Sequence, residues 1–394
     1  MRLYKILLTH VFGMLMIGCN PKPISTIEVT VPHQGPYQVG TTNMEIADDY
    51  LNIGDDEMHQ YLIGHINDDG EIKNFADLLK YPESAFITQI QIPDVPEVYK
   101  ELHGKSYPVV TYLAYPTIER EIKNSYQFPY HNSQYGEFID MLSNGNKPEF
   151  PEAQKKYPLI LLSHGMTAHG IYDVGHAQKL ASHGYIVAVT TYGDLRVKSD
   201  SEYSFLRPLI TKVVLDKLLK SEDFGPHIDR ENIGISGFSF GGYTALALSG
   251  AQFMNNANSV VDQRIKAAFV GAPWVGINKL FSKHYIFGEK NTNLSNIEIP
   301  VMLLFGSNDT ITTPSSILPA SKLISGPTYV VELVGQGHDL QEGSWYDRDS
   351  WELLFFSAYL KNNRDSLKSL RSAGSMSGGN EDRQLAEYQR LPDN

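Results

Sequence analysis

The second half of the chain alternates uninterrupted apolar runs with helical patterns. The runs that we expect to be strands cover residues 157–165, 185–192, 232–238, 265–274, 299–309 and 328–338. Helices are expected between them, at 176–181, 206–221 and 244–250. Continuous apolar runs are typical of strands that are buried on both faces, and their alternation with helices implies βαβ units. The pattern therefore predicts an α/β fold with a mostly parallel, doubly wound sheet flanked by helices.

The first half is less regular. Residues 107–117 read as a strand, because they are rich in β-branched and aromatic side chains and bounded by prolines. Residues 45–106 are acidic, and we interpret them as solvated loops. The aromatic-rich insert 118–156 either walls the cleft or forms a satellite core cluster. Since no repeat and no linker divides the chain, we predict one domain over 33–371 with an N-terminal elaboration.

The two ends of the chain have a different composition from this domain. Residues 1–18 have a positive start and an apolar run that is too short to span a bilayer, so they predict a signal peptide. The run ends before Cys19, the only cysteine, in a pattern that resembles the lipobox of bacterial lipoproteins. Residues 19–32 contain three prolines and predict a tether. The polar residues 372–394 predict a mobile tail.

These features bear on where the protein acts. Lipidated Cys19 would anchor an exported protein to a bacterial membrane, and Asn20 favours the outer membrane where there is one. A plain secretory signal with an incidental cysteine is the alternative. The formal net charge of −12 opposes binding to nucleic acid. A single cysteine allows no internal disulfide.

The sequence Gly-Phe-Ser-Phe-Gly at residues 237–241 suggests a catalytic serine. Taken alone, the pattern could mark only close packing of a helix. Its context is more specific, because a predicted strand leads into Ser239 and a predicted helix follows it. This is the strand–turn–helix setting of a nucleophile elbow. We therefore predict that Ser239 is a nucleophile.

A serine nucleophile needs a base, and the base needs a carboxylate to orient it. Asp309 and His338 follow Ser239 in that order, and each lies beyond the end of a predicted strand. The oxyanion hole should combine the N–H of Phe240 with that of Met166, which follows an earlier strand.

Other chemistries are disfavoured. His164, His169 and His176 lack the spacing and the accompanying carboxylates of a zinc site, and we expect His164 to brace its loop. Neither G-x-G-x-x-G nor a P-loop lysine is present. We expect no metal and no organic cofactor.

Several motifs in order resemble the platelet-activating factor acetylhydrolase and dienelactone hydrolase group of α/β-hydrolases. They are "GPYQVG", "AYPT", "KYPLILLSHG", "LASHGYIVA" and "IDRENIGISGFSFGG". The later "APWVG", "IPVMLLFGSNDTI" and "GQGH" are similar to bacterial cutinase-like polyester hydrolases. The resemblance implies an α/β-hydrolase fold, the triad named above, and Trp274 as a substrate contact. It departs at Phe238, where the acetylhydrolase elbow usually has histidine.

The sequence thus predicts a serine carboxylic-ester hydrolase that works through an acyl-enzyme. Acyl transfer, peptide hydrolysis and a non-catalytic binding role on the same scaffold are the alternatives. The sequence leaves open the ester itself, which could be a phospholipid, an acetylated polysaccharide, a feruloyl ester or a polyester. It also leaves open the oligomeric state.

Overall fold

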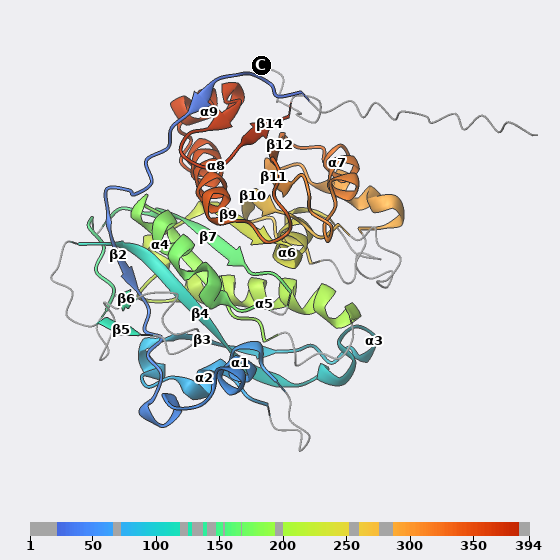
Figure 1. The fold of residues 1–394 in the computed structure, drawn as a ribbon. Helices are drawn as coiled ribbons and strands as arrows, with labels where there is room; N and C mark the ends of the chain where they lie inside the picture. Colours follow the sequence, from blue (N-terminus) through green and yellow to red (C-terminus); the bar gives the residue numbers. More distant parts are fainter. Residues whose placement is uncertain are drawn as a thin grey trace, which may run out of the picture.

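A twisted sheet of ten strands forms the centre of the protein (Figure 1). The computed structural model describes residues 22–65, 72–118, 125–127, 137–139, 147–152, 154–166, 168–193, 200–251, 260–275 and 287–385. The strand order is β14-β12-β11-β10-β9-β7-β8-β4-β2, and β3 also pairs with β4. The strands are β2 (Gln38–Thr41), β3 (Phe86–Gln91), β4 (Ser106–Thr117), β7 (Tyr157–Ser163), β8 (Ile186–Thr190), β9 (Ile228–Phe238), β10 (Ile265–Gly271), β11 (Val301–Gly306), β12 (Thr328–Leu333) and β14 (Asp382–Gln384).

Strands β7 to β12 run parallel, whereas β2, β3, β4 and β14 pair antiparallel with their neighbours. The mostly parallel α/β fold predicted from the apolar runs is therefore confirmed. Because all six parallel strands point the same way, their carboxyl ends meet at one edge of the sheet.

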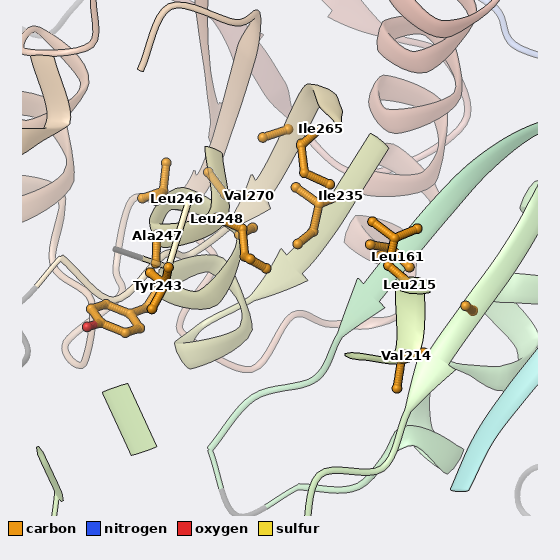
Figure 2. Close-up of a cluster of buried hydrophobic side chains, with 14 of the residues drawn as sticks. Leu161, Val214, Leu215, Ile235, Tyr243, Leu246, Ala247, Leu248, Ile265 and Val270 are labelled. Carbon is orange, nitrogen blue, oxygen red and sulfur yellow. The ribbon is translucent and has the colours of Figure 1, made fainter. Parts of the chain in front are cut away.

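Each parallel strand contributes alternate residues to two cores. Leu159 and Leu161 of β7 pack in one core, part of which Figure 2 shows, whereas Ile160 and Leu162 pack in the other. The first core also holds side chains of α5 (Asp200–Lys220), α6 (Phe240–Ser249) and α7 (Pro314–Ser321). The second holds side chains of α4 (Val174–Ser182), α8 (Glu342–Leu360) and α9 (Arg364–Ser372). Helices on both faces explain why these strands carry apolar side chains on both of their sides.

The acidic region 45–106 is more ordered than its composition suggests. It contains α1 (Asp55–Ile63), α2 (Phe75–Leu78), β3 and α3 (Pro96–Tyr99), so the interpretation as solvated loops is wrong for these elements. The apolar residues that lie between its charged ones are the reason. Phe86 and Ile90 of β3 are buried beside β4, and Met58 is buried in the second core.

Both chain ends that the structure describes pack against the domain. β1 (Glu28–Val29) pairs with β13 (Ser375–Met376), and the Ile24 N–H donates to the Gln384 carbonyl at 2.9 Å. β14 adds an edge strand to β12. The predictions of a tether and of a mobile tail are therefore wrong for residues 22–32 and 372–385. Main-chain hydrogen bonds between the two ends, together with buried Met376, hold them in place.

Some predicted features lie outside the described residues. These are the signal peptide 1–18, Cys19, residues 386–394 and much of the insert. Within the insert, β5 (Ser125–Gln127) and β6 (Glu137–Ile139) form a small antiparallel pair. Phe150 packs in the first core against Tyr157. For this residue of the insert, the structure agrees with a role in the core and not in the wall of the cleft. None of the helices that the structure describes is both long enough and apolar enough to cross a membrane.

Candidate active site

Ser239 lies in a sharp turn between β9 and α6. Its φ of 55° and ψ of −117° are rarely adopted by residues with a side chain. Hydrogen bonds from both sides hold this conformation. The Ser239 N–H donates to the Gly271 carbonyl at 2.8 Å, and its own carbonyl accepts from the Trp274 N–H at 2.9 Å. The strained turn that the sequence context predicted is present.

The two glycines of the motif are required by close backbone contacts. A Cβ atom on Gly241 would lie 1.9 Å from the Ser163 carbonyl oxygen of β7. A Cβ atom on Gly237 would lie 2.2 Å from the Gly241 carbonyl oxygen. Both distances are far shorter than any van der Waals contact, so only glycine lets α6 start this close to the sheet.

The structure brings Ser239, His338 and Asp309 into one hydrogen-bonded chain. His338 Nε2 is 3.0 Å from Ser239 Oγ, and His338 Nδ1 is 2.8 Å from Asp309 Oδ2. The three residues follow the carboxyl ends of β9, β12 and β11. This arrangement lets Nδ1 donate to the carboxylate while Nε2 accepts the serine proton.

Four hydrogen bonds fix the Asp309 carboxylate. Oδ1 accepts from the N–H groups of Ile311 at 2.8 Å and Thr312 at 2.9 Å. Oδ2 accepts from the Thr312 hydroxyl at 2.7 Å and from His338. Burial opposes ionisation of Asp309, but the hydrogen bonds from His338 and Thr312 outweigh it and hold the pKa of the carboxyl below its usual value. Asp309 is thus a fixed, charged acceptor.

The two predicted oxyanion donors flank Ser239. Phe240 is the first residue of α6, and N–H groups at the start of a helix point out of its end. Met166 follows Gly165, where an added Cβ would lie 3.7 Å from Ser239 Cβ. Met166 also lines the cavity above the serine.

The loop that carries Met166 is held by residues that the sequence analysis did not single out. Arg207 of α5 is fully buried and donates to the carbonyls of His164 at 2.6 Å and Gly165 at 2.8 Å. The His164 ring also contacts the Gly165 carbonyl, through Nδ1 at 2.8 Å, which fits the bracing role expected of it. Arg207 could not be found by spacing, because it lies 42 residues from Gly165.

A cavity of about 860 Å³ opens beside Ser239. Its rim carries three exposed apolar side chains, namely Tyr172 (44% exposed), Ile311 (54%) and Trp345 (38%). Exposed apolar groups gathered at one cavity are typical of a binding site for a partly apolar ligand. Phe238, the residue that departs from the acetylhydrolase pattern, packs between the rings of His338 and Trp345 in this cavity.

Trp274 has a different position from the one its resemblance implied. Its backbone N–H donates to the Ser239 carbonyl, but its indole packs against the first core and does not line the described cavity. Trp345 of α8 is the tryptophan at the rim. A contact between Trp274 and substrate stays a prediction.

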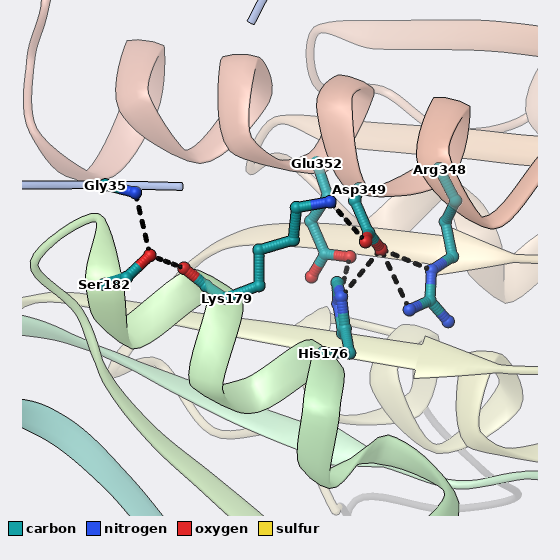
Figure 3. A network of polar contacts seen from close by, with 7 residues as sticks. All are labelled: Gly35, His176, Lys179, Ser182, Arg348, Asp349 and Glu352. Carbon is teal, nitrogen blue, oxygen red and sulfur yellow. Dashed lines mark hydrogen bonds and ion pairs between the residues drawn. The ribbon is translucent and has the colours of Figure 1, made fainter. Parts of the chain in front are cut away.

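A buried charge network lies beside the cavity (Figure 3). Its members His176, Arg348 and Asp349 line the cavity. His176 of α4 lies between two carboxylates of α8, with Nδ1 2.8 Å from Asp349 and Nε2 2.8 Å from Glu352. Lys179 and Arg348 each bind Asp349 as well, at 2.8 and 3.0 Å. The network joins two helices that are distant in sequence.

The three histidines considered as metal ligands lie in different settings. His164 contacts the Gly165 carbonyl, His169 stacks on Tyr172, and His176 is ion-paired. Among the residues that the structure describes, no group of three or more histidines, cysteines or carboxylates could hold a metal ion.

The network predicts a pH-dependent contribution to stability. Burial and Arg348 oppose charge on His176, but Glu352 and Asp349 outweigh them and raise its pKa from 6.5 to about 9. A raised pKa stabilises the fold fully below pH 6.5, and the stabilisation is lost as the pH rises through 9. We expect His176→Gln to lower the free energy of unfolding most near pH 6. The difference between variant and wild type should be smaller by about 3 kcal/mol at pH 10.

Urea unfolding of wild type and His176→Gln at both pH values measures this difference. His103→Gln is the control, because His103 is paired with Asp94 at the surface, where ion pairs contribute little. A cost for His176→Gln that does not change with pH would contradict the charged state of this ring.

Comparisons with known proteins agree with the fold. The family model described as platelet-activating factor acetylhydrolase, isoform II, matches residues 132–202. A protein of Bacillus subtilis (strain 168) described as the uncharacterized peptidase YuxL is 26% identical over 358 residues. That similarity covers 83% of the chain but 51% of the relative, so the chain spans about half of the relative's length. The resemblance found in the sequence is thereby confirmed at the level of the superfamily: the chain is similar to α/β-hydrolases in sequence, and its mostly parallel sheet flanked by helices is consistent with their fold.

Proposed function

We propose that the protein is a serine carboxylic-ester hydrolase. The observation that carries this proposal is the hydrogen-bonded chain from Ser239 through His338 to Asp309. Ser239 and His338 line a cavity with an apolar rim, which suits an ester with an apolar acyl or alcohol part. The match to an acetylhydrolase family supports the same reaction.

The geometry suits a two-step acyl transfer to water. Ser239 Oγ attacks the ester carbonyl carbon, its proton moves to His338 Nε2, and the carbonyl oxygen becomes an oxyanion. The N–H groups of Met166 and Phe240 are the donors that we propose for that oxyanion. When the intermediate collapses, the leaving alcohol takes the proton from His338. Water then attacks the acyl-enzyme by the same steps and releases the acid.

Peptide hydrolysis is the second candidate, because the similar protein YuxL is described as a peptidase. That protein is about twice as long as its aligned part. The comparison therefore relates the present chain to only about half of that protein. Acyl transfer to an alcohol uses the same acyl-enzyme and differs only in the acceptor. A non-catalytic binding role would leave the hydrogen-bonded chain without a use.

Substrate turnover and covalent labelling test the proposal. We expect the purified protein to hydrolyse p-nitrophenyl esters of two to twelve acyl carbons, and to cleave peptide p-nitroanilides at least 100-fold more slowly. A fluorophosphonate should form one adduct, on the peptide that carries Ser239. Faster anilide than ester cleavage would favour a peptidase. A folded protein that neither turns over nor is labelled would contradict the serine-hydrolase proposal.

We also propose that the enzyme is exported and anchored through lipid on Cys19, as the pattern before that cysteine suggests. Metabolic labelling with an alkyne fatty acid tests this. Label that persists in Cys19→Ala would contradict the anchor.

A further inference from the structure

Arg207 has an unusual environment for a charged side chain. It is 0% exposed, and its guanidinium lies between two aromatic rings, 4.8 Å from the centre of Tyr192 and 5.0 Å from that of Phe240. Burying a charge costs free energy unless the charge is well bound. Here the ring faces and two backbone carbonyls of the loop after β7 provide that binding.

The Gly165 carbonyl accepts hydrogen bonds from two donors at once. Arg207 Nη2 donates to it at 2.8 Å. His164 Nδ1 lies 2.8 Å from the same carbonyl oxygen, which can only accept, so Nδ1 carries the ring proton and donates to it. Nε2 then accepts the Tyr192 N–H, at 3.4 Å. A cation and an imidazole N–H therefore both withdraw electron density from this oxygen.

This carbonyl belongs to the same peptide unit as the Met166 N–H. A peptide unit is a planar, conjugated group, so density drawn toward its oxygen increases the C–N double-bond character and leaves the N–H more positive. Linked hydrogen bonds polarise one another in this way, most of all in a water-free interior. The Met166 N–H becomes a stronger donor as a result.

We propose that Arg207 is a positioning residue for catalysis, which orients and polarises the Gly165–Met166 peptide as an oxyanion donor. The proposal rests on the proposed esterase function and adds a residue to it. It also explains why residue 207 is an arginine and not a lysine. The planar guanidinium fork reaches two successive carbonyls, whereas a lysine ammonium acts as a single point charge.

The test compares Arg207→Met, Arg207→Lys and the matched control Lys212→Met. Lys212 is on the same helix and also donates to a backbone carbonyl, that of Val261, but away from the loop. We expect kcat to fall 10- to 100-fold in Arg207→Met and less in Arg207→Lys. KM should stay within about threefold of wild type, and Lys212→Met should retain wild-type kcat.

The affinity for a trifluoromethyl ketone distinguishes a role in oxyanion binding from a merely structural role, which would leave that affinity unchanged. Its carbonyl carbon bonds to Ser239 Oγ, the serine proton passes to His338, and the ketone oxygen becomes the oxyanion. We expect its affinity to fall by the same factor as kcat/KM. With ¹⁵N-methionine, which labels the ten methionines of the full sequence and one more in Arg207→Met, the Met166 amide proton should shift upfield in that variant. Met166→Leu assigns that signal.

The outcomes separate the two proposals. Wild type that neither hydrolyses esters nor reacts with a fluorophosphonate overturns the esterase function, and the role of Arg207 with it. If wild type is active, folded Arg207 variants with wild-type kcat, unchanged ketone affinity or an unshifted Met166 signal overturn the role of Arg207 alone. If Arg207→Met fails to fold, Arg207→Lys decides between the same outcomes.

Discussion

Ser239→Ala is expected to lower kcat for p-nitrophenyl esters roughly a million-fold, close to the rate without nucleophilic catalysis. The hydroxyl is the atom that bonds to the acyl group, and the structure places it 3.0 Å from His338 Nε2. KM should change little, because the cavity wall stays intact. The backbone hydrogen bonds that fix residue 239 do not involve its side chain, so the variant should fold normally.

Stopped-flow and long-time assays of the purified variant measure this loss. Ser249→Ala is the matched control, because it removes a hydroxyl at the far end of the same helix, which donates to the Ala245 carbonyl. The control should retain wild-type kcat. Residual activity of 1% or more in folded Ser239→Ala, free of wild-type contamination, would show that another group attacks the ester.

The main sheet and the central turn could be predicted from the sequence because their causes are local. A strand that is buried on both faces needs apolar side chains on both, so β7 and β11 are visible in the sequence as continuous apolar runs. The glycines at 237 and 241 are fixed by contacts of 2.2 and 1.9 Å that no side chain could occupy. A local steric rule of this kind leaves a short motif in the chain.

The parts that were missed depend on partners far away in sequence. β1 pairs with β13 across about 350 residues, and neither segment has the apolar pattern of a buried strand. The ion pairs of His176 join α4 to α8, 176 residues away in the case of Glu352. Single charged residues have no period that would reveal such pairing. The same holds for Arg207, whose role becomes visible only when the loop after β7 lies beside α5.

Asp309→Asn is expected to lower kcat about 10⁴-fold, although the two side chains have nearly the same shape. The hydrogen bonds of Asp309 decide the orientation of the new amide. Its Oδ1 accepts two backbone N–H groups, those of Ile311 and Thr312, so the amide oxygen must take this place. The amide NH₂ then takes the place of Oδ2 and faces His338 Nδ1.

A donor at that position reverses the tautomer of the catalytic ring. His338 Nδ1 must then accept a proton, so Nε2 carries one and can no longer take the proton of Ser239. Asp339→Asn is the matched control, because Asp339 is exposed, lines the same cavity and also loses one charge. The control should stay within about threefold of wild type, since an exposed charge is screened by solvent. If Asp309→Asn retained more than a tenth of wild-type kcat, the carboxylate would have no part in orienting His338, and the rate would depend on Ser239 and His338 alone.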